Sequence, residues 1–567
     1  MNLPIFTNAE ECKDCYKCIR ECPVKAIKVE NSKTSIMKEN CILCAKCVQL
    51  CKNGAKTYKN DVARVFDLLN SGKKVIASLD PTFIGELTNY SVNQFISILK
   101  QLGFYQISET AIGADFLSSQ INLEIQNSSD NLIISSDCPV CVSYIHKYFP
   151  EYKKYISNLC SPMLAHARFL KQYYGEEIQV VYIGPCVAKK IEAEFNNEVF
   201  AVLTFEEIKQ MIIENKIEEN FCEPQESFEF VPFNSASGSN FSYQGGIIDS
   251  LNLYNQKSDC TKISVSGIKN IANALKKLKP ENLTQKFFLE VHSCNGGCVN
   301  GRVVLNKTST LEKLAKIKEF SLSRKKTFDD ELKYLPDCKK NIPEMSSQQE
   351  IFYKDEQIKQ ALESIGKFTS KDYLNCNGCG YSTCKNFAIG LITGRTEKEM
   401  CLSYIRTLAL QKANSLIHAI PSGVVIVNKD LKILECNENF AKLYGSNLVD
   451  EYKKNGLKNS DLTQIVKNHN LFSILLSSED TEFIDREVHE DNKIFHFRIF
   501  YIENKNIIAA VIEDITAPGI RKNRIITQAQ KVIDKNLEVV QKIAFLLGEN
   551  AAETEAMLNS IIESYGN

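Results

Sequence analysis

The sequence predicts a multidomain α/β protein. Its 567 residues exceed the roughly 250–300 residues at which a single hydrophobic core stops growing, so two or more domains are expected. Hydrophobic residues make up 44% of the chain, which is enough for each domain to bury a core. In the middle of the chain, short β-rich runs at Lys74–Leu79, Asn131–Ile134 and Gln179–Ile183 alternate with helical stretches such as Met163–Tyr174. This alternation is typical of parallel strands joined by helices.

The charges are nearly balanced, with 68 basic and 69 acidic residues and a net charge of −1. This balance argues against nucleic acid or an anionic membrane as the main partner. Residues 1–14 lack the apolar core of a signal peptide, and no apolar run reaches the roughly 18–20 residues of a membrane span. We therefore expect a cytoplasmic protein. In a reducing compartment, 22 cysteines indicate metal or iron–sulfur clusters rather than disulfides.

Residues 1–57 are predicted to form a ferredoxin-like domain with two [4Fe-4S] clusters. Two cysteine runs share the spacing C-x2-C-x2-C-x3-C, in which the fourth cysteine of each run ligates the other cluster. Zinc is disfavoured, because three thiolates at this spacing lie too close together for the usual paired knuckle. Lys52 follows the second run where a proline is usual. The predicted ligands are Cys12, Cys15, Cys18 and Cys51 for one cluster, and Cys41, Cys44, Cys47 and Cys22 for the other.

Three cysteine-bearing peptides follow in the α/β region. The last of them, Glu290–Arg302, holds two cysteines four residues apart, so both thiols face one side of a helical turn. The glycines beside them would leave the backbone open to a bulky group. Taken alone, this peptide fits a zinc corner or two buried thiols about as well as it fits a cofactor site. The three peptides are Ser136–Pro139, Gly184–Glu192 and Glu290–Arg302, and the first two join a cysteine to a proline.

In order and spacing these peptides resemble the cluster-binding loops of the [FeFe] hydrogenases, over residues 62–341. The resemblance implies a two-lobed α/β catalytic domain at residues 60–345. It also implies a [4Fe-4S] cluster that one cysteine bridges to a two-iron unit carrying CO and cyanide. Lys189 matches the lysine that donates to a cyanide, and Glu192 completes the second motif. The implied ligands are Cys138, Cys186, Cys294 and Cys298, with Cys298 as the bridge.

The same loops depart from the family pattern along the proton path. Asp137 lies where the family has a proton-relaying cysteine, and Cys141 lies where it has a tryptophan. Glu124 is what remains of a glutamate-rich run, while Gly184 and His292 replace methionines beside the site. We therefore expect intact ligation and a rebuilt proton path. The predicted catalytic residues are Asp137, Lys189 and Cys298.

A further cluster domain is predicted at residues 366–404, after a charged stretch at 321–350 that is typical of a linker. Its spacing, C-x2-C-x4-C-x16-C, resembles a small single-cluster domain found in several redox proteins. Gly378 and Gly380 would let the backbone wrap a cluster, which favours [4Fe-4S] over zinc. A helical stretch over 396–420 leads out of it. The predicted ligands are Cys376, Cys379, Cys384 and Cys401.

Residues 412–516 resemble a PAS domain, which has an α+β fold. Cys436 lies outside the flavin-adduct motif of light sensors, so we interpret it as a core residue. His489 and His496 are candidate haem ligands, but single histidines on strands are more often structural. The segments that carry the resemblance are Gly423–Val427, Cys436–Phe440 and Ile508–Glu513.

Residues 519–565 form a predicted helical tail. Apolar residues recur in it every seven positions, from Ile525 through Val532 and Val539 to Leu546. This heptad pattern fits a coiled coil or helix pair, and it fits equally a helix that covers the PAS sheet.

Intact ligation, an altered proton path, an extra cluster domain and a PAS domain together resemble the sensory [FeFe] hydrogenases. The resemblance implies an enzyme that reacts slowly with hydrogen (H2 = 2 H+ + 2 e−) and passes the redox signal through its clusters to the PAS domain. The implied cofactors are four [4Fe-4S] clusters and a two-iron CO/cyanide unit. The implied partners are H2 and protons, a ferredoxin-like redox protein, a separate kinase, phosphatase or regulator, and a second copy bound through the PAS domain and tail.

Three other functions fit parts of the pattern. One is a slow metabolic [FeFe] hydrogenase that exchanges electrons with ferredoxin, which the altered proton path at Asp137 disfavours. Another is a redox sensor that uses the clusters alone and does not depend on hydrogen. The third is an iron–sulfur trafficking protein without the two-iron unit, which the presence of Cys298 and Lys189 disfavours.

Overall fold

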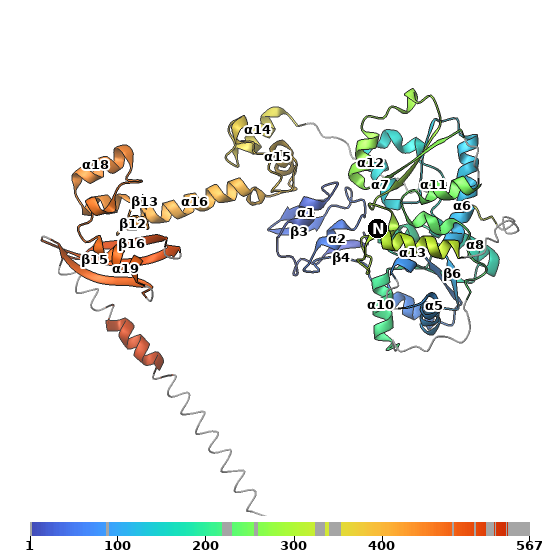
Figure 1. The fold of residues 1–567 in the computed structure, drawn as a ribbon, viewed down its shortest axis with the longest axis horizontal. Coiled ribbons are helices and arrows are strands. Elements are labelled where there is room, and N and C mark those ends of the chain that lie inside the picture. Colours follow the sequence, from blue (N-terminus) through green and yellow to red (C-terminus); the bar gives the residue numbers. More distant parts are fainter. Residues whose placement is uncertain are drawn as a thin grey trace, which may run out of the picture. The chain divides into compact units, whose positions relative to one another are not determined.

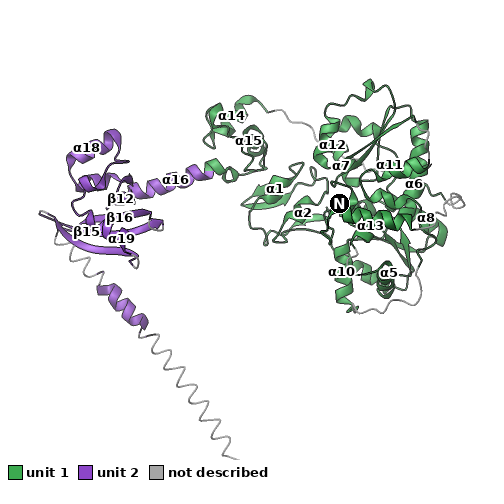
Figure 2. Cartoon of the chain, in the orientation of Figure 1, with its two compact units in different colours: residues 1–404 green, residues 405–567 purple. Residues whose placement is uncertain are grey.

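The computed structural model describes residues 3–86, 90–217, 229–254, 259–323, 335–339, 353–478, 481–490, 492–503, 506–517, 527, 529–539 and 541. The chain divides into two compact units, residues 1–404 and residues 405–567 (Figure 2). None of the helices in the described residues is both long and apolar enough to cross a membrane.

The N-terminal 58 residues repeat one small motif, with a short helix at the third cysteine of each run (Figure 1). Each helix begins directly after a residue with left-handed backbone, Tyr16 (φ 53°) or Ala45 (φ 55°). Two antiparallel strand pairs, β1 with β4 and β2 with β3, support the loops. The elements are β1 (Ile5–Thr7), α1 (Lys17–Glu21), β2 (Ile27–Glu30), β3 (Lys33–Ile36), α2 (Lys46–Leu50) and β4 (Lys56–Tyr58).

Two separate parallel sheets follow, in the orders β6-β5-β8-β9 and β10-β11-β7. The three strands predicted from sequence correspond to β5, β7 and β8, each within one residue of its expected start. The strands are β5 (Val75–Leu79), β6 (Gln106–Glu109), β7 (Leu132–Ile134), β8 (Gln179–Ile183), β9 (Ala201–Leu203), β10 (Thr261–Ser266) and β11 (Phe287–His292).

Helices cover both faces of each sheet. Helices α6, α8 and α11 form a shared middle layer, because their apolar side chains pack in one core with Val180 of the first sheet and Phe288 of the second. Helices α3, α5 and α10 cover the outer face of the first sheet, and α7 and α12 that of the second. The helices are α3 (Val62–Leu69), α4 (Phe83–Glu86), α5 (Val92–Gln101), α6 (Ala111–Asn127), α7 (Pro139–Tyr148), α8 (Pro162–Tyr174), α9 (Ala188–Phe195), α10 (Phe205–Glu214), α11 (Gly246–Tyr254), α12 (Ile268–Leu275) and α13 (Thr310–Leu322).

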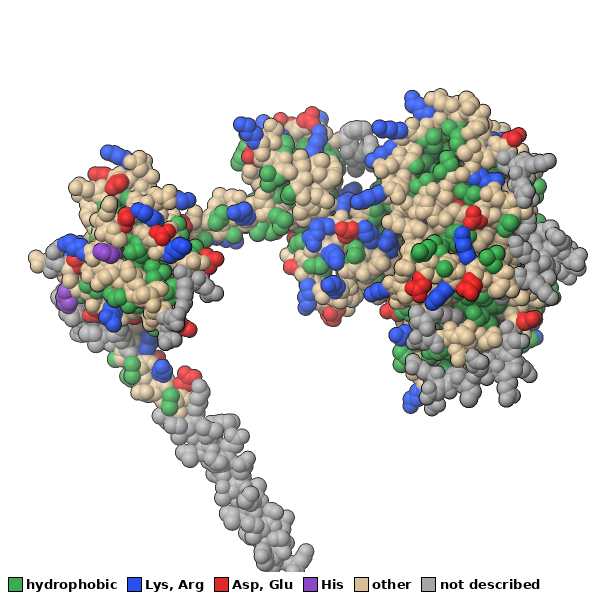
Figure 3. All heavy atoms as spheres, in the orientation of Figure 1, with side chains coloured by type: hydrophobic (Ala, Val, Ile, Leu, Met, Phe, Trp, Pro, Cys, Tyr) green, Lys and Arg blue, Asp and Glu red, His purple; other side chains and the backbone are tan. Residues whose placement is uncertain are grey.

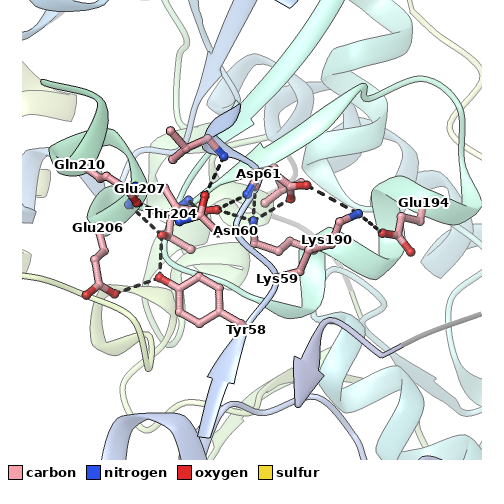
Figure 4. A network of polar contacts seen from close by, with 12 residues as sticks. Tyr58, Lys59, Asn60, Asp61, Lys190, Glu194, Thr204, Glu206, Glu207 and Gln210 are labelled. Atoms are coloured by element: carbon pink, nitrogen blue, oxygen red, sulfur yellow. Dashed lines mark hydrogen bonds and ion pairs between the residues drawn. The ribbon is translucent and has the colours of Figure 1, made fainter. Parts of the chain in front are cut away.

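A buried polar network joins the N-terminal domain to the first parallel sheet (Figure 4). The Lys190 ammonium, 1% exposed, lies 2.8 Å from Asp61 and 2.9 Å from Glu207. The Tyr58 hydroxyl lies 3.0 Å from the Thr204 hydroxyl. Separating the N-terminal domain from this sheet is strongly disfavoured, because each of these buried charges would then lose its partner of opposite sign.

The 366–404 region contains α15 (Cys384–Ile392), and α14 (Asp355–Glu363) precedes this region and packs in the same core. The helix expected over 396–420 is shorter and is α16 (Leu402–Ala419), because residues 398–400 form a 3-10 turn and Cys401 is extended. Most of the predicted linker lies outside the described residues, at 324–334 and 340–352.

The second unit contains a five-stranded antiparallel sheet in the order β13-β12-β16-β15-β14. Cys436 is 6% exposed in its core, as expected. His496 bonds to Asp485 on the neighbouring strand, and His489 lies opposite Ile494. The elements are β12 (Gly423–Asn428), β13 (Ile433–Cys436), α17 (Glu438–Leu443), α18 (Ser446–Asn455), α19 (Asn470–Ser477), β14 (Phe483–Glu490), β15 (Lys493–Glu503) and β16 (Ile507–Asp514).

Residues 529–539 of the predicted tail are helical. Val532 and Val539 of its heptad stripe are 58% and 49% exposed. The remainder of the stripe, including Ile525 and Leu546, lies outside the described residues.

Candidate metal-cluster site

Four cysteines converge at the carboxyl ends of parallel strands. Cys138 follows β7, Cys186 follows β8, Cys294 follows β11, and Cys298 begins the next 3-10 turn. All four line one cavity of about 30 Å³. Its opposite wall is Leu43, Cys44 and Ala45 of the N-terminal domain. The strand-end location is the one expected for a site in a parallel sheet.

A larger cavity of about 60 Å³ adjoins the first and shares three of its cysteines, including Cys298. Here the lining is mixed. Asp80, Asp137 and Lys189 contribute charged groups to it, and the rest is largely apolar. The apolar lining includes Pro81, Ala111, Ala114, Met163 and Phe241. A two-part cavity with a cysteine wall between its halves fits a two-part cofactor held through that wall.

Burial keeps three of the four cysteines in the protonated thiol form. Burial raises the pKa of Cys186 to about 12, and it raises the pKa of Cys298 as well. Cys138 is the exception, because the Cys141 thiol donates a hydrogen bond to it and lowers its pKa. Ligand thiols bind metals deprotonated, so cluster insertion would release protons.

Among the described residues, no three His, Cys, Asp or Glu side chains are placed to hold a single metal ion. A four-iron cluster is larger than one ion, so its cysteine ligands lie further apart. The spaces that these cysteines line are therefore the relevant test of fit.

The glycines of the third loop serve close chain packing. A Cβ on Gly297 would lie 2.5 Å from the Tyr243 Cα, and one on Gly301 would lie 2.8 Å from Pro185. At both positions the group that lies against the glycine is a neighbouring segment of the chain. These glycines let two neighbouring segments reach the cysteine wall.

Lys189 lies on α9 and lines the larger cavity. Its ammonium lies 2.7 Å from one Glu192 oxygen and 3.4 Å from the Asp137 carbonyl. The other Glu192 oxygen is buried without a hydrogen-bond partner. This i, i+3 pair holds a cation against the cavity, where it can donate to an anionic ligand.

Asp137 is a second buried charged residue that lines the same cavity. One of its oxygens has no hydrogen-bond partner, and the other lies 3.9 Å from His292 Nδ1. His292 Nε2 lies 2.8 Å from a Glu290 oxygen. Burial raises the pKa of Asp137 to about 6, partly opposed by His292. Burial also acts to lower the pKa of His292, but Glu290 and Asp137 outweigh it and raise that pKa to about 9.

Sequence reasoning missed a second polar pair in the larger cavity. The Tyr182 hydroxyl donates to Asp80 at 2.5 Å, and both residues line the cavity. A Cβ on Gly184 would lie 2.5 Å from the Tyr182 hydroxyl, so glycine at this position makes room for the tyrosine. The loss of a methionine at Gly184 was the signal that could have revealed this pair.

Asp115 holds another wall of the larger cavity. Its carboxylate accepts the backbone N–H groups of Ala236, Ser237 and Gly238 at 2.7 to 2.9 Å. Gly238 itself lines the cavity. The carboxylate therefore fixes a loop that closes the site.

The N-terminal cysteine loops share one backbone form. Left-handed residues occupy the same places in both, Asp14 and Tyr16 in the first and Leu43 and Ala45 in the second. Such turns aim successive N–H groups inward, a form common at iron–sulfur sites. Backbone N–H groups lie 3.3 to 3.4 Å from the sulfurs of Cys22, Cys41 and Cys51.

The third cysteine set also surrounds one space. Cys376, Cys379, Cys384 and Cys401 line a cavity of about 20 Å³. Each of the predicted four-cysteine sets outside the N-terminal domain is thus brought to a single cavity.

Comparison with known proteins gives matches to three domain models. Residues 73–302 match the iron only hydrogenase large subunit, C-terminal domain. Residues 4–52 match a 4Fe-4S dicluster domain, and residues 373–403 match an Fe–S cluster model. The protein thus contains a hydrogenase-like domain together with iron–sulfur domains.

Among curated relatives, iron hydrogenase 1 of Clostridium pasteurianum is 27% identical over 48% of this chain and 65% of its own length. The NADP-reducing hydrogenase subunit HndD of Solidesulfovibrio fructosivorans is 26% identical over 46% of this chain and 55% of its own. This chain thus spans less than two thirds of either relative. A cytosolic Fe-S cluster assembly factor of Drosophila ananassae is 23% identical over 53% of this chain and 82% of its own length.

Among solved structures, a variant of [FeFe]-hydrogenase HydA1 from Chlamydomonas reinhardtii has a TM-score of 0.35 and 17% identity, covering 46% of this chain and 88% of its own. The PAS domain of an HTR-like protein from Haloarcula marismortui has a TM-score of 0.16 and 15% identity. That match covers 19% of this chain and 99% of its own.

Proposed function

We propose that this protein is a sensory [FeFe] hydrogenase. It reacts slowly with hydrogen at a two-part iron site and passes the redox change through iron–sulfur clusters to a PAS domain. The observation that carries the proposal is the two-part cavity, in which four cysteines line one half and three of them continue into a largely apolar second half that also holds three charged residues.

The proposed ligands are Cys138, Cys186, Cys294 and Cys298 for the divided site, with Cys298 as the bridge. When bound, the two-iron unit would supply the position at which H2 is split into two protons and two electrons. Lys189 would hold the unit by donating to its cyanide, with Glu192 fixing the direction of the ammonium. The apolar lining would exclude water from the reacting position.

Asp137 would accept a proton from the larger cavity. Asp137 lines the cavity and one of its oxygens has no hydrogen-bond partner, while His292 lies near the other oxygen and is itself paired with Glu290. The long 3.9 Å contact between Asp137 and His292 is a weak link for proton transfer, because direct transfer needs about 2.6–3.2 Å or one intervening water. Slow turnover follows from that gap, and slow turnover is compatible with sensing.

Electrons would enter and leave through the N-terminal clusters, since Cys44 lies at the wall of the smaller cavity. On the face drawn in Figure 3, Lys and Arg side chains gather over this N-terminal domain. A basic surface suits an acidic redox protein as electron partner. The regulatory partner would bind the second unit, whose exposed heptad stripe at Val532 and Val539 also suits a homodimer.

A second candidate function is iron–sulfur cluster assembly without hydrogen chemistry, because several relatives are named as assembly factors. The smaller cavity alone would serve that function. The larger cavity, with Lys189 and its unpartnered acceptors, has no use in it and favours the hydrogenase proposal.

The deciding experiment is hydrogen–deuterium exchange on the fully loaded protein, oxidised or reduced with H2. Protection of helix α16 should change on hydrogen addition, and Cys384→Ser, which breaks the 376–401 cluster, should abolish that change. Cys260→Ala is the matched control, because this buried thiol belongs to no cluster set, and it should keep the change. If the hydrogen–deuterium exchange of α16 is the same with and without H2, the proposed sensory function is wrong. Infrared CO and cyanide bands that never form after loading would instead favour cluster assembly.

A further inference from the structure

The small cluster domain shares one apolar core with the N-terminal domain. Ile19 of α1 and Val29 of β2 are 0% and 3% exposed and pack in the same cluster as Phe387 of α15. Cys18, Cys22, Cys47, Cys379 and Cys384 lie at the edge of this core. The two domains are therefore packed together although more than 300 residues separate them in sequence.

Backbone contacts fix the relative position of the two domains. The Val29 N–H donates to the Arg395 carbonyl at 3.1 Å, and the Ser32 N–H lies 3.4 Å from the Glu397 carboxylate. The main-chain hydrogen bond fixes which residues of the two domains lie opposite each other.

A second close approach of the two backbones lies next to two cluster cysteines. A Cβ on Gly380 would lie 2.8 Å from the Arg20 Cα, so the two backbones touch there. Gly380 directly follows Cys379, and Arg20 precedes Cys22 by two residues. The Lys25 ammonium, held by the Ile19 and Arg20 carbonyls at 3.0 and 2.8 Å, lies beside this contact. Burial lowers the pKa of Lys25, while Cys22 and Cys379 both oppose that change, so Lys25 senses both sulfurs.

The cluster set that contains Cys22 also borders the hydrogenase-like site. Cys44, its second member, lines the smaller cavity together with Cys294. Cys18 of the other N-terminal set lies with Cys22 and Cys47 at the edge of the shared core. Three cysteine sets thus adjoin the one that contains Cys22.

We propose that the cluster of Cys22, Cys41, Cys44 and Cys47 is a three-way electron junction. One arm leads to the four-cysteine cavity through Cys44, one to the cluster of Cys12, Cys15, Cys18 and Cys51, and one to the 376–401 cluster through the Cys22–Cys379 contact. The 376–401 cluster therefore accepts electrons from the N-terminal domain rather than directly from the hydrogen site.

The junction divides electrons in a defined way. Oxidation of one H2 releases two protons and two electrons, and each [4Fe-4S] cluster takes up one electron. The two electrons can leave the junction separately, one along each outer arm. This consequence depends on the proposed hydrogen reaction, whereas the junction itself does not.

The test is electron paramagnetic resonance on the full chain with its four-iron clusters, reduced by dithionite without two-iron unit or hydrogen. The reduced 376–401 cluster should couple magnetically to the Cys22 cluster, which broadens and splits the signal. Cys384→Ser should remove that splitting. Val29→Arg, which places a charge in the shared core, should remove it while the iron content stays unchanged. Tyr381→Phe is the matched control, because the buried Tyr381 hydroxyl has no hydrogen-bond partner, and it should keep the splitting.

A wild-type spectrum equal to the sum of independent clusters would overturn the junction. If Val29→Arg loses iron, the double variant Ser32→Cys, Glu397→Cys replaces it. A short thiol-reactive cross-linker should join those positions and leave the splitting intact. Failure to cross-link, or a cross-linked protein without splitting, also refutes the proposal. Since hydrogen is absent throughout, these outcomes are independent of the sensory function.

Discussion

The two halves of the cysteine cavity follow different rules. The smaller half is built from four cysteines and the wall around Cys44, and every ligand predicted from the motifs reaches it. The larger half has the expected Lys189 and Asp137, and in addition the Asp80–Tyr182 pair, which was not predicted from the sequence. The smaller half depends on cysteines at fixed positions in their loops. The charged groups of the larger half come from several helices and loops, so they can change in evolution while the cysteines stay in place.

Removing the shared wall should have the largest effect. Cys298→Ala takes away the thiol that lines both halves and is the proposed bridge, so infrared bands of a loaded two-iron unit should vanish. Iron of the other three clusters should remain. Unchanged bands in Cys298→Ala would mean that Cys298 is no ligand and that the two halves are independent.

Asp137 tests the larger half alone. Asp137→Ala should slow hydrogen turnover by about 100-fold or more, because it removes the first proton acceptor, and Asp137→Cys should speed it up. With a pKa of about 6, the carboxylate accepts protons above that pH, so hydrogen oxidation by the parent should rise as pH rises through about 6. Asp137→Asn should lose that rise. Equal rates in Asp137→Ala and the parent would make Asp137 structural.

Lys189 and Lys190 are neighbours in sequence, but Lys189 lines the larger cavity whereas Lys190 lies in the polar network at the domain junction. Lys189→Met should weaken retention of the two-iron unit by roughly 10–100-fold, as outer donors commonly do. Lys190→Met should leave the infrared bands in place but destabilise the domain junction by about 3–5 kcal/mol, since Asp61 and Glu207 lose their partner. The same loss of the unit in both variants would contradict a specific role for Lys189.

The smallest expected effect lies away from both halves. His166 is fully buried between Ser78 and Ser108, at 2.7 and 2.9 Å, and burial lowers its pKa to about 3. Between that value and about 6.5, the unfolded chain binds a proton that the folded chain does not. Stability should therefore be highest above pH 6.5 and fall as pH falls below it. Amide exchange in α8 should report this loss, and His166→Gln should flatten it; an equally steep loss in that variant would assign it to another group.

The sequence by itself determined the cluster domains and the strand-end loops. Cysteine spacing is local, and a cysteine that closely follows a strand lies at the edge of the sheet. Short β-rich runs are local as well, so the starts of β5, β7 and β8 were predicted within one residue. The start of α16 was missed, because the turn at 398–400 interrupts an otherwise helical pattern.

Only the tertiary structure decided what surrounds those thiols. Tyr182 bonds to Asp80 across neighbouring strands, Gly297 admits Tyr243 from a distant loop, and Gly380 meets Arg20 across the whole chain. No local pattern encodes such pairs, since each depends on where two separately folded segments meet. Spacing in sequence thus predicts which residues hold the clusters. Packing decides which polar groups line the cavity, and which cysteine sets lie next to one another.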